Sequence, residues 1–352
     1  MSTKYNIYIQ RCFDLARLGA GNVSPNPLVG AVISTPNKII GEGYHIQYGK
    51  SHAEVNAVEQ ALKNNFKNFQ NTTLFVSLEP CNFQGKTPAC TDLIKHHRIP
   101  TVVVAAIDKT DKVNFAGIQN LKAHGHQVEY GILKEKGEFL ARIRNTFISR
   151  KRPYIILKYA QSQDGYIGQQ GKQIWISNGY TKRLVHKWRA EVKAIIVGKN
   201  TVIVDDPSLT TRLYPGKSPL RVSIDLNNEI SKTAKIKNNE ANSWIYTTSS
   251  APSTDNQTFK NKIVHDSETV LRQICTDLFE EDLDTLFVEG GAALLQSFID
   301  ADLWDEARII TSPTSLDNGI AAPKLSGIRI ADFKMHNDQI ELLLSPKNVI
   351  YS

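Results

Sequence analysis

The stretches HAEVNAVEQA (52–61) and EPCNFQGKTPAC (79–90) decide the fold and the chemistry of the first part of the chain. A histidine opens a predicted helix, and two of the chain's 4 cysteines follow beside a loop that contains glycine and proline. Zinc prefers nitrogen and sulfur ligands, and a catalytic zinc site keeps one of its four positions for water. His52, Cys81 and Cys90 are therefore the predicted metal ligands.

Glu54 is the predicted catalytic residue, because it follows His52 by two positions and so points elsewhere on the same helix. A carboxylate there can take a proton from a water that the metal acidifies and pass it to a leaving nitrogen. This is hydrolytic deamination of an amidine-like base. Zinc base deaminases carry the signature H-x-E with a later P-C-x-x-C. Pro80 and Cys81 match it, although eight residues separate Cys81 from Cys90 instead of two.

Two other interpretations of this cluster stay open from the sequence alone. The zinc could be structural, or the cysteines could be buried without a metal. A closed structural site needs a fourth ligand, and none stands nearby in sequence. His96 and His97 are expected to be exposed or to cap the helix that follows Cys90.

The bulk composition indicates a folded chain of two domains. Its 352 residues exceed the length at which one hydrophobic core stops growing. Hydrophobic residues make up 41% and charged residues 22%, as in ordinary globular proteins. The chain has no apolar run of about 18 residues, no signal-peptide pattern and few cysteines. We therefore expect a cytoplasmic protein with no membrane contact.

The formal charge of +7 is unevenly spread along the chain. Residues 1–150 contain 18 Lys and Arg against 11 Asp and Glu, whereas residues 151–352 contain 24 of each kind. A basic excess can serve a nucleic acid, an anionic small substrate or only a solvated surface. Charge alone does not choose among them.

Runs of Val and Ile without polar alternation predict an α/β layered domain in residues 1–150. An amphipathic helix is expected first, with one face made of Tyr8, Ile9, Cys12, Phe13 and Ala16. The further expected elements are a strand at 28–34, a helix at 53–63, a strand at 73–78, a helix after Pro88 and a strand at 101–107.

A basic segment with a proline, ISRKRPYIILKYA (148–160), places a domain boundary near Lys151. A second α/β series is expected over residues 151–352. Its strands are expected at 154–160, 194–198, 220–226, 243–248, 285–290 and 307–312, and its helices include 181–190 and 292–301. Surface loops are expected at 238–242 and 247–257.

The segment FVEGGAALLQSF (287–298) predicts a strand, a tight glycine turn and a helix. Backbone N–H groups at such a helix start can approach a phosphate closely. A Gly-Gly pair is also an ordinary connector, so both interpretations stay open. The segment lacks the G-x-G-x-x-G fingerprint, which disfavours a Rossmann domain.

Taken together, these motifs resemble the bifunctional pyrimidine deaminase/reductase family of riboflavin biosynthesis. The segments that resemble its deaminase half are SPNPLVGAVI (24–33), GEGYH (41–45), HAEVNA (52–57) and EPCNFQGKTPAC (79–90). Those that resemble its reductase half are LKYAQSQDGYIG (157–168), WISN (175–178), VHKWRAEVKAIIVGKNTVIVDDPSLTTR (185–212) and FVEGGAALLQSFI (287–299). The resemblance covers most of the chain. It implies an N-terminal cytidine-deaminase-like three-layer α/β/α domain (1–150) followed by a dihydrofolate-reductase-like α/β domain (151–352).

For the deaminase half, the resemblance implies one Zn²⁺ on the three predicted ligands and proton transfer by Glu54. It also implies substrate contacts by Asn26, His45 and Lys86. Taken without the family, Asn26 could be a turn residue, His45 a surface histidine, and Lys86 a solvated lysine or a phosphate contact.

The chain departs from the family's usual pattern at several positions. Phe83 stands where a histidine is more common, which leaves stacking on a pyrimidine possible but removes a polar contact. Leu28 and Ala89 stand where arginine and proline are frequent. In the second half, Tyr166 stands where the family often has arginine.

For the reductase half, the resemblance implies a site for NADPH. The implied cofactor-lining residues are Ala160, Trp175, Thr201, Asp205, Gly291, Ala292, Ala293, Leu294, Leu295, Gln296 and Ser297. The implied substrate-facing residues are Lys158, Arg189, Leu209, Arg212 and Glu289. Arg189 and Arg212 could hold a ribose phosphate by paired hydrogen bonds. Without the family, Trp175 could be plain core and Asp205 part of a turn.

The implied reaction sequence has two steps. The first is zinc-dependent hydrolytic deamination of 2,5-diamino-6-(ribosylamino)-4(3H)-pyrimidinone 5'-phosphate. The second is NADPH-dependent reduction of the ribosyl chain, which gives 5-amino-6-(ribitylamino)uracil 5'-phosphate. The expected partners are this phosphorylated pyrimidine and further copies of the chain in a dimer or larger homo-oligomer. No nucleic acid and no membrane are expected.

Two rival functions make different predictions. A tRNA or nucleoside deaminase fused to a nucleic-acid-binding module would bind RNA with a steep salt dependence. A noncatalytic protein with structural zinc would keep every activity unchanged after Glu54→Gln.

Overall fold

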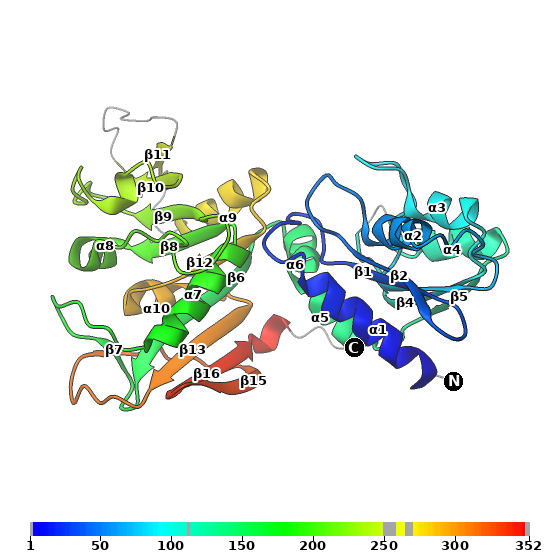
Figure 1. Cartoon of the computed structure of the whole chain (residues 1–352). Helices are drawn as coiled ribbons and strands as arrows, with labels where there is room; N and C mark the ends of the chain where they lie inside the picture. The colour runs from blue at the N-terminus through cyan, green and yellow to red at the C-terminus, as the bar shows by residue number, and fades with distance from the viewer. Residues whose placement is uncertain (1–2, 111–112, 249–257, 265–269, 349–352) are drawn as a thin grey trace. The chain divides into compact units, whose positions relative to one another are not determined.

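The computed structural model describes residues 3–110, 113–248, 258–264 and 270–348 (Figure 1). The chain divides into two compact units, Met1–Lys151 and Arg152–Ser352, and each contains one large sheet. Most of the expected loop at 247–257 lies outside the described residues. In the part of the chain that is described, no helix combines the length and the apolar character needed to cross a membrane.

The sheet of the first unit has five strands in the order β2-β1-β3-β4-β5. The strands are β1 (Gly30–Ser34), β2 (Ile39–Tyr44), β3 (Thr73–Leu78), β4 (Thr101–Ala106) and β5 (Gln127–Tyr130). β1 is antiparallel to both of its neighbours, whereas β3, β4 and β5 run parallel. The parallel strands therefore end at the same edge of the sheet, where loops can build a site.

Helices cover both faces of this sheet (Figure 1). They are α1 (Thr3–Arg17), α2 (Ala53–Lys63), α3 (Cys90–His96), α4 (Ala116–Ala123), α5 (Lys134–Leu140) and α6 (Arg142–Arg150). Alternate strand residues point to opposite faces. Val32 and Phe75 pack with α1, whereas Ile33 and Leu74 pack with α2. The predicted three-layer α/β/α architecture is confirmed.

The expected elements of the first unit correspond closely to the observed ones. The helix at 53–63 and the strand at 73–78 have the predicted bounds, whereas the strand expected at 28–34 begins at Gly30. The strands β2 and β5 and the helices α4 to α6 were not among the expected elements. β2 has the sequence IIGEGY, whose glycines and glutamate weaken the strand pattern.

The large sheet of the second unit has nine strands in the order β11-β10-β9-β8-β12-β6-β13-β16-β15. They are β6 (Tyr154–Ser162), β8 (Ala194–Gly198), β9 (Leu220–Ile224), β10 (Ser243–Thr247), β11 (Phe259–Ile263), β12 (Thr285–Val288), β13 (Glu306–Ser312), β15 (Ile328–Met335) and β16 (Asp338–Leu344). β16 is antiparallel to β13 and β15, and the remaining pairs are parallel. β7 (Tyr166–Gly168) and β14 (Ile320–Ala321) form a small separate sheet.

Helices also pack on the nine-stranded sheet. They are α7 (Gly179–Glu191), α8 (Lys199–Asp205), α9 (Val270–Glu280) and α10 (Ala292–Asp300). Residues of α9 and α10 share one apolar core with Leu286 and Val288 of β12. Phe287, which points to the opposite face, meets the Trp188 ring of α7 with 6.4 Å between centroids. The mixed α/β sheet is confirmed. The predicted helix at 181–190 is present and extends over Gly179–Glu191, and the helix predicted at 292–301 ends one residue earlier, at Asp300.

Two glycines of β2 set the position of α2. A Cβ atom at Gly41 would lie 2.2 Å from the carbonyl oxygen of Ala57, and one at Gly43 would lie 2.4 Å from that of Ala53. These contacts are with backbone atoms, so the helix itself would have to shift. The helix start that carries His52 and Glu54 therefore depends on glycine in the neighbouring strand.

Gly43→Ala is expected to destabilise the first unit by about 1–3 kcal/mol, because the added methyl group overpacks the contact between β2 and α2. Urea unfolding measures this effect. Gly179→Ala is the control, since a Cβ atom there meets nothing within 4 Å. Equal stability of the two variants would contradict the proposed contact.

Candidate functional site

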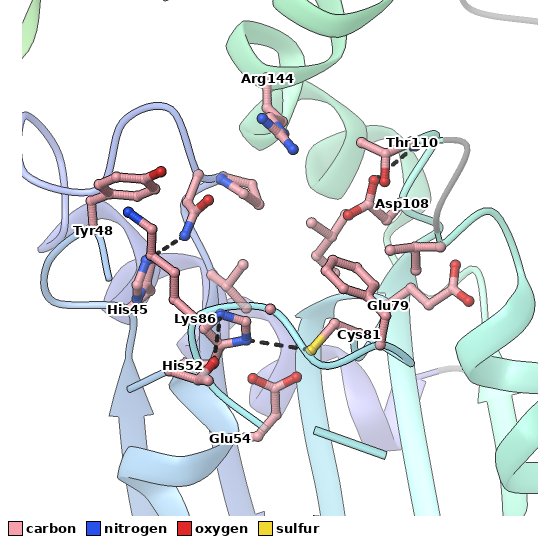
Figure 2. Close-up of a pocket in the computed structure, with 18 of the residues that line it drawn as sticks. His45, Tyr48, His52, Glu54, Glu79, Cys81, Lys86, Asp108, Thr110 and Arg144 are labelled. Carbon is pink, nitrogen blue, oxygen red and sulfur yellow. Dashed lines mark hydrogen bonds between the residues drawn. The ribbon is translucent and has the colours of Figure 1, made fainter. Parts of the chain in front are cut away.

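Three predicted ligands meet in the first unit. The Sγ atoms of Cys81 and Cys90 lie 3.5 and 3.3 Å from Nδ1 of His52. The three ligand atoms lie within 4.8 Å of one another. His52 is the N-cap residue of α2, and Cys90 is the first residue of α3. Figure 2 shows His52 and Cys81 facing each other.

The donor set and its electrostatics fit a zinc ion. The pKa of the Cys81 thiol falls to about 4, because the Cys90 thiol and His52 form hydrogen bonds with its sulfur. The same contact with Cys81, together with burial, raises the pKa of Cys90. A divalent cation among these atoms favours both thiolates. One nitrogen and two sulfur donors are a ligand set that zinc prefers.

The two other nearby histidines lie outside this cluster, as predicted. His96 is exposed. His97 is the C-cap residue of α3, and its ring lies edge-on to Phe69 with 5.0 Å between centroids.

Glu54 lies beside the cluster in the first turn of α2, and only 3% of the residue is exposed. Its carboxyl group lies close to His52 and Cys81 (Figure 2) and interacts with the Cys90 thiol. Burial raises the pKa of this carboxyl group, and the charge of His52 opposes that rise. A buried carboxylate with a raised pKa is a suitable proton acceptor.

Asn26 and His45 form a hydrogen-bonded pair on the wall of a cavity that His52, Glu54 and Cys81 also line. The His45 ring contacts the carbonyl oxygen of Ser51 through Nδ1 at 3.1 Å and the Asn26 amide nitrogen through Nε2 at 3.1 Å. A carbonyl oxygen only accepts, so Nδ1 carries the hydrogen and Nε2 accepts from Asn26. Burial lowers the pKa of His45, which favours this neutral form. The alternative of a surface histidine is wrong, since His45 is 3% exposed.

The cavity is about 200 Å³ in volume and has an aromatic and basic rim. Phe83 and Lys86 both line it, and Phe83 is 40% exposed. The Lys86 ammonium group lies 4.1 Å from the centre of the Tyr48 ring, as in a cation–π contact. All the predicted deaminase-site residues except Cys90 line this one cavity. Cys90 contacts two of the lining residues, Cys81 and His52.

Sequence reasoning missed several residues that line this cavity. They are Tyr48, Lys50, Glu79, Asp108, Thr110 and Arg144. Asp108 follows the end of β4, so the rule that parallel strands build sites at their carboxyl ends could have found it. Arg144 comes from α6 and lies across the cavity from Glu54 (Figure 2), and no local sequence signal indicates it.

Glu79, the first residue of the segment 79–90, fixes the end of β3 that precedes Cys81. Its carboxylate accepts the backbone N–H groups of Phe115, Gly117 and Ile118 at 3.0, 2.9 and 3.3 Å. These groups lie at the start of α4, where a negative charge is favourable. A Cβ atom at Gly117 would lie 2.2 Å from the carbonyl oxygen of Pro80. Glu79 and Gly117 together therefore hold the Cys81 loop against α4.

The second unit has a separate cavity of about 620 Å³. Six of the predicted cofactor residues line it, namely Thr201, Asp205, Gly291, Ala292, Ala293 and Leu294. Gly291 has φ +74° and is the N-cap residue of α10, and no side chain caps this helix start. The first backbone N–H groups of α10 are therefore available to an anion.

The other predicted cofactor residues do not line this cavity. They are Ala160, Trp175, Leu295, Gln296 and Ser297. Leu295 belongs to the apolar core, and Gln296 is bonded to Asp300 and to the backbone N–H of Lys324. Trp175 is not core, as one alternative held, because 67% of it is exposed.

The predicted substrate-facing residues of the second unit form a connected polar cluster. Arg189 donates from Nε and Nη2 to Glu289 at 2.9 and 2.6 Å, and from Nη1 to the carbonyl oxygen of Thr210 at 3.3 Å. Burial lowers the pKa of Lys158, which interacts with Glu289 and Arg189. The Arg212 guanidinium donates to Oγ1 of Thr210 at 3.1 Å. Leu209 is buried beside this cluster, and its backbone has φ +55°.

Comparison with known families agrees with this division of the chain. The model described as "Cytidine and deoxycytidylate deaminase zinc-binding region" matches residues 2–106. The model described as "RibD C-terminal domain" matches residues 153–335. Most residues that line the cavity of the first unit lie within the first match, and those that line the cavity of the second unit lie within the second match.

Individual relatives match nearly the whole chain. The riboflavin biosynthesis protein RibD of Aquifex aeolicus (strain VF5) is 35% identical over 343 residues, which cover 96% of this chain and 95% of that protein. RibD of Escherichia coli (strain K12) is 31% identical and covers 88% of each chain. A crystal structure of a diaminohydroxyphosphoribosylaminopyrimidine deaminase/5-amino-6-(5-phosphoribosylamino)uracil reductase from Thermotoga maritima is 32% identical, with a TM-score of 0.89 over 98% of this chain and 99% of that one.

Glu79→Gln is expected to weaken metal retention as well as stability, because an amide offers one acceptor where the carboxylate offers two. A lost buried hydrogen bond costs about 1–3 kcal/mol. Zinc content after dialysis against a weak chelator, together with urea unfolding, measures both effects. Glu129→Gln, at an exposed position of β5, is the control. Equal zinc retention in the two variants would contradict the role assigned to Glu79.

Proposed function

Because the chain belongs to the RibD family of bifunctional deaminase/reductases of riboflavin biosynthesis, we propose that it converts one phosphorylated pyrimidine in two steps. The first unit deaminates 2,5-diamino-6-(ribosylamino)-4(3H)-pyrimidinone 5'-phosphate, and ammonia leaves. The second unit reduces the ribosyl chain with NADPH and gives 5-amino-6-(ribitylamino)uracil 5'-phosphate. The observation that carries the proposal is the buried carboxylate of Glu54 beside the cluster of His52, Cys81 and Cys90.

In the deaminase site, His52, Cys81 and Cys90 would hold the zinc ion. Zinc bound there supplies a water whose pKa lies near neutrality. Glu54 would take up a proton from the attacking water and would deliver it to the leaving nitrogen. Its burial supports this role, because a raised pKa lets the carboxyl group both take and release a proton.

The cavity wall supports the binding of a flat, polar base. The His45 ring accepts the hydrogen bond of the Asn26 amide nitrogen, so the Asn26 amide oxygen is left to accept from a substrate amino group. Phe83 offers an apolar surface on which a pyrimidine can stack. Lys86 at the rim suits the phosphate as a point charge.

In the reductase site, the cavity beside Gly291 and Thr201 would hold NADPH, and NADPH supplies the hydride. The uncapped start of α10 suits a cofactor phosphate. Lys158 and Glu289 interact electrostatically, and Lys158 would donate the proton that must accompany the hydride. Burial lowers the pKa of Lys158, which eases proton release from its Nζ.

The proposal also covers the cellular location and the partners of the protein. We place the protein in the cytoplasm, and we expect a homo-oligomer without nucleic acid. Cell fractionation, light scattering and RNA binding at two salt concentrations check these points. Steep salt-dependent RNA binding would favour a nucleic-acid deaminase instead.

Glu54→Gln is expected to lower the deamination rate by about 10²–10⁴-fold, because the amide cannot move a proton. Zinc content should stay equal to that of the unchanged protein, since Glu54 is not one of the three ligands. Mass spectrometry of the products without NADPH measures the first step.

The same variant separates the two activities. With pre-deaminated substrate and NADPH, Glu54→Gln should oxidise NADPH at the rate of the unchanged protein. A folded variant that loses both activities would refute the model of two separate sites.

Gly291→Ala is expected to raise the KM for NADPH about tenfold, an effect of ~1.4 kcal/mol. The reason is that φ +74° strains an alanine, and its Cβ atom would lie 3.3 Å from Oγ1 of Thr201. Gln296→Ala is the matched control from the same segment and should leave this KM unchanged, because the Gln296 side chain bonds to Asp300 and Lys324. A larger effect at Gln296 than at Gly291 would contradict the proposed cofactor site.

A further inference from the structure

The loop 209–212 of the second unit carries two of the residues proposed to face the substrate, Leu209 and Arg212. Leu209 has φ +55°, a backbone conformation that residues other than glycine adopt uncommonly. Such a conformation persists only where surrounding contacts impose it. The contacts that impose it therefore control the shape of this part of the site.

Two residues of α7 hold the loop. His186 accepts the backbone N–H of Arg212 at its Nδ1 atom, at 3.0 Å. Arg189 donates to the carbonyl oxygen of Thr210 at 3.3 Å. The two residues are three positions apart and so lie on the same side of the helix. One helix thus contacts a donor and an acceptor of the loop backbone.

His186 is 2% exposed, and its surroundings favour the form that can accept a hydrogen bond. A backbone N–H only donates, so Nδ1 must be unprotonated and Nε2 carries the hydrogen. Burial and the charges of Arg189, Arg212 and Lys182 lower the pKa of His186 to about 4, and Glu289 opposes this. The imidazole is therefore neutral near pH 7.

The helix that carries His186 is itself fixed at its other end. Asn178 caps α7 by accepting the N–H groups of Tyr180 and Thr181 at 2.9 and 3.0 Å. The backbone N–H of Asn178 donates to Asp338 at 2.9 Å, and its side chain donates to the carbonyl oxygen of Met335. α7 is therefore anchored to the turn between β15 and β16 and can act as a rigid support.

We propose that His186 is a positioning residue of the reductase site, which holds the loop 209–212 in the shape that the phosphorylated substrate requires. This inference rests on the proposed function. His186 contacts the loop backbone and acts through Leu209 and Arg212. Its effect should therefore fall on substrate affinity, whereas hydride transfer and NADPH binding depend on other residues.

Two substitutions of similar size test this role. His186→Leu removes the acceptor and leaves the N–H of Arg212 unsatisfied, and should raise the KM for the pre-deaminated pyrimidine phosphate roughly tenfold. His186→Asn places Oδ1 near the position of Nδ1 and should restore most of the affinity. In both variants kcat, the KM for NADPH and the deaminase rate should stay close to those of the unchanged protein. A KM that rises equally in both variants, or in neither, would overturn the proposal.

Amide hydrogen exchange distinguishes failure of this inference from failure of the proposed function. The peptide that contains Arg212 should exchange faster in His186→Leu than in His186→Asn or the unchanged protein, whatever substrate the site accepts. If the unchanged protein does not reduce the pyrimidine phosphate, the proposed function fails. If exchange of that peptide is the same in all three proteins, the positioning role of His186 fails.

Discussion

The contact between the imidazole of His52 and the two cysteine sulfurs is the constraint that the packing of the first unit has to satisfy. These three side chains come from two helix starts and one strand end, so the sheet, α2 and α3 must all be placed before the contact can form. The close approach of α2 to β2 at Gly43 fixes the first of these helix starts. The bonds of Glu79 to the start of α4 fix the strand end. Packing of ordinary secondary structure thus controls the distance between metal ligands.

Burial raises the pKa of the carboxyl groups of both Glu54 and Glu79, but their hydrogen bonds differ. Glu54 is buried close to the cluster, and its raised pKa makes it a better proton acceptor. Glu79 is equally inaccessible, yet three backbone N–H groups satisfy its oxygens, so its part is structural. The two carboxylates line the same cavity. Their hydrogen-bond partners, and not their exposure, separate their roles.

In the second unit, hydrogen-bond partners again separate the roles of two charged residues, Arg189 and Arg212. Arg189 forms a paired contact with Glu289, so much of its hydrogen-bonding capacity is used within the protein. The simple expectation that Arg189 and Arg212 together clamp a phosphate therefore applies better to Arg212, which is exposed. Arg189 instead joins the loop 209–212 to Glu289. Charge in this site therefore supports the loop, and its part in recognising the substrate remains a proposal.

The sequence by itself predicted the metal ligands of this protein and much of its layered architecture. His52, Glu54, Cys81 and Cys90 could be assigned because zinc chemistry restricts the residue types and because the helix start sets their spacing. The buried strands at 73–78 and 101–106 could be predicted because their sequences are mainly continuous apolar runs. Short, polar elements such as β2 and β5 could not, since glycine and charge mask their pattern.

Only the tertiary structure decided which distant residues share a cavity. Arg144 faces the site from α6, and His186 meets Arg212 across 26 positions of sequence. Neither residue has a local signal, because its role arises from how a helix packs on its sheet. For the same reason Gly291 lines the second cavity, whereas Gln296 does not line it and bonds to the backbone N–H of Lys324. A linear motif records the order of residues, whereas the direction of a side chain depends on the packing of the element that carries it.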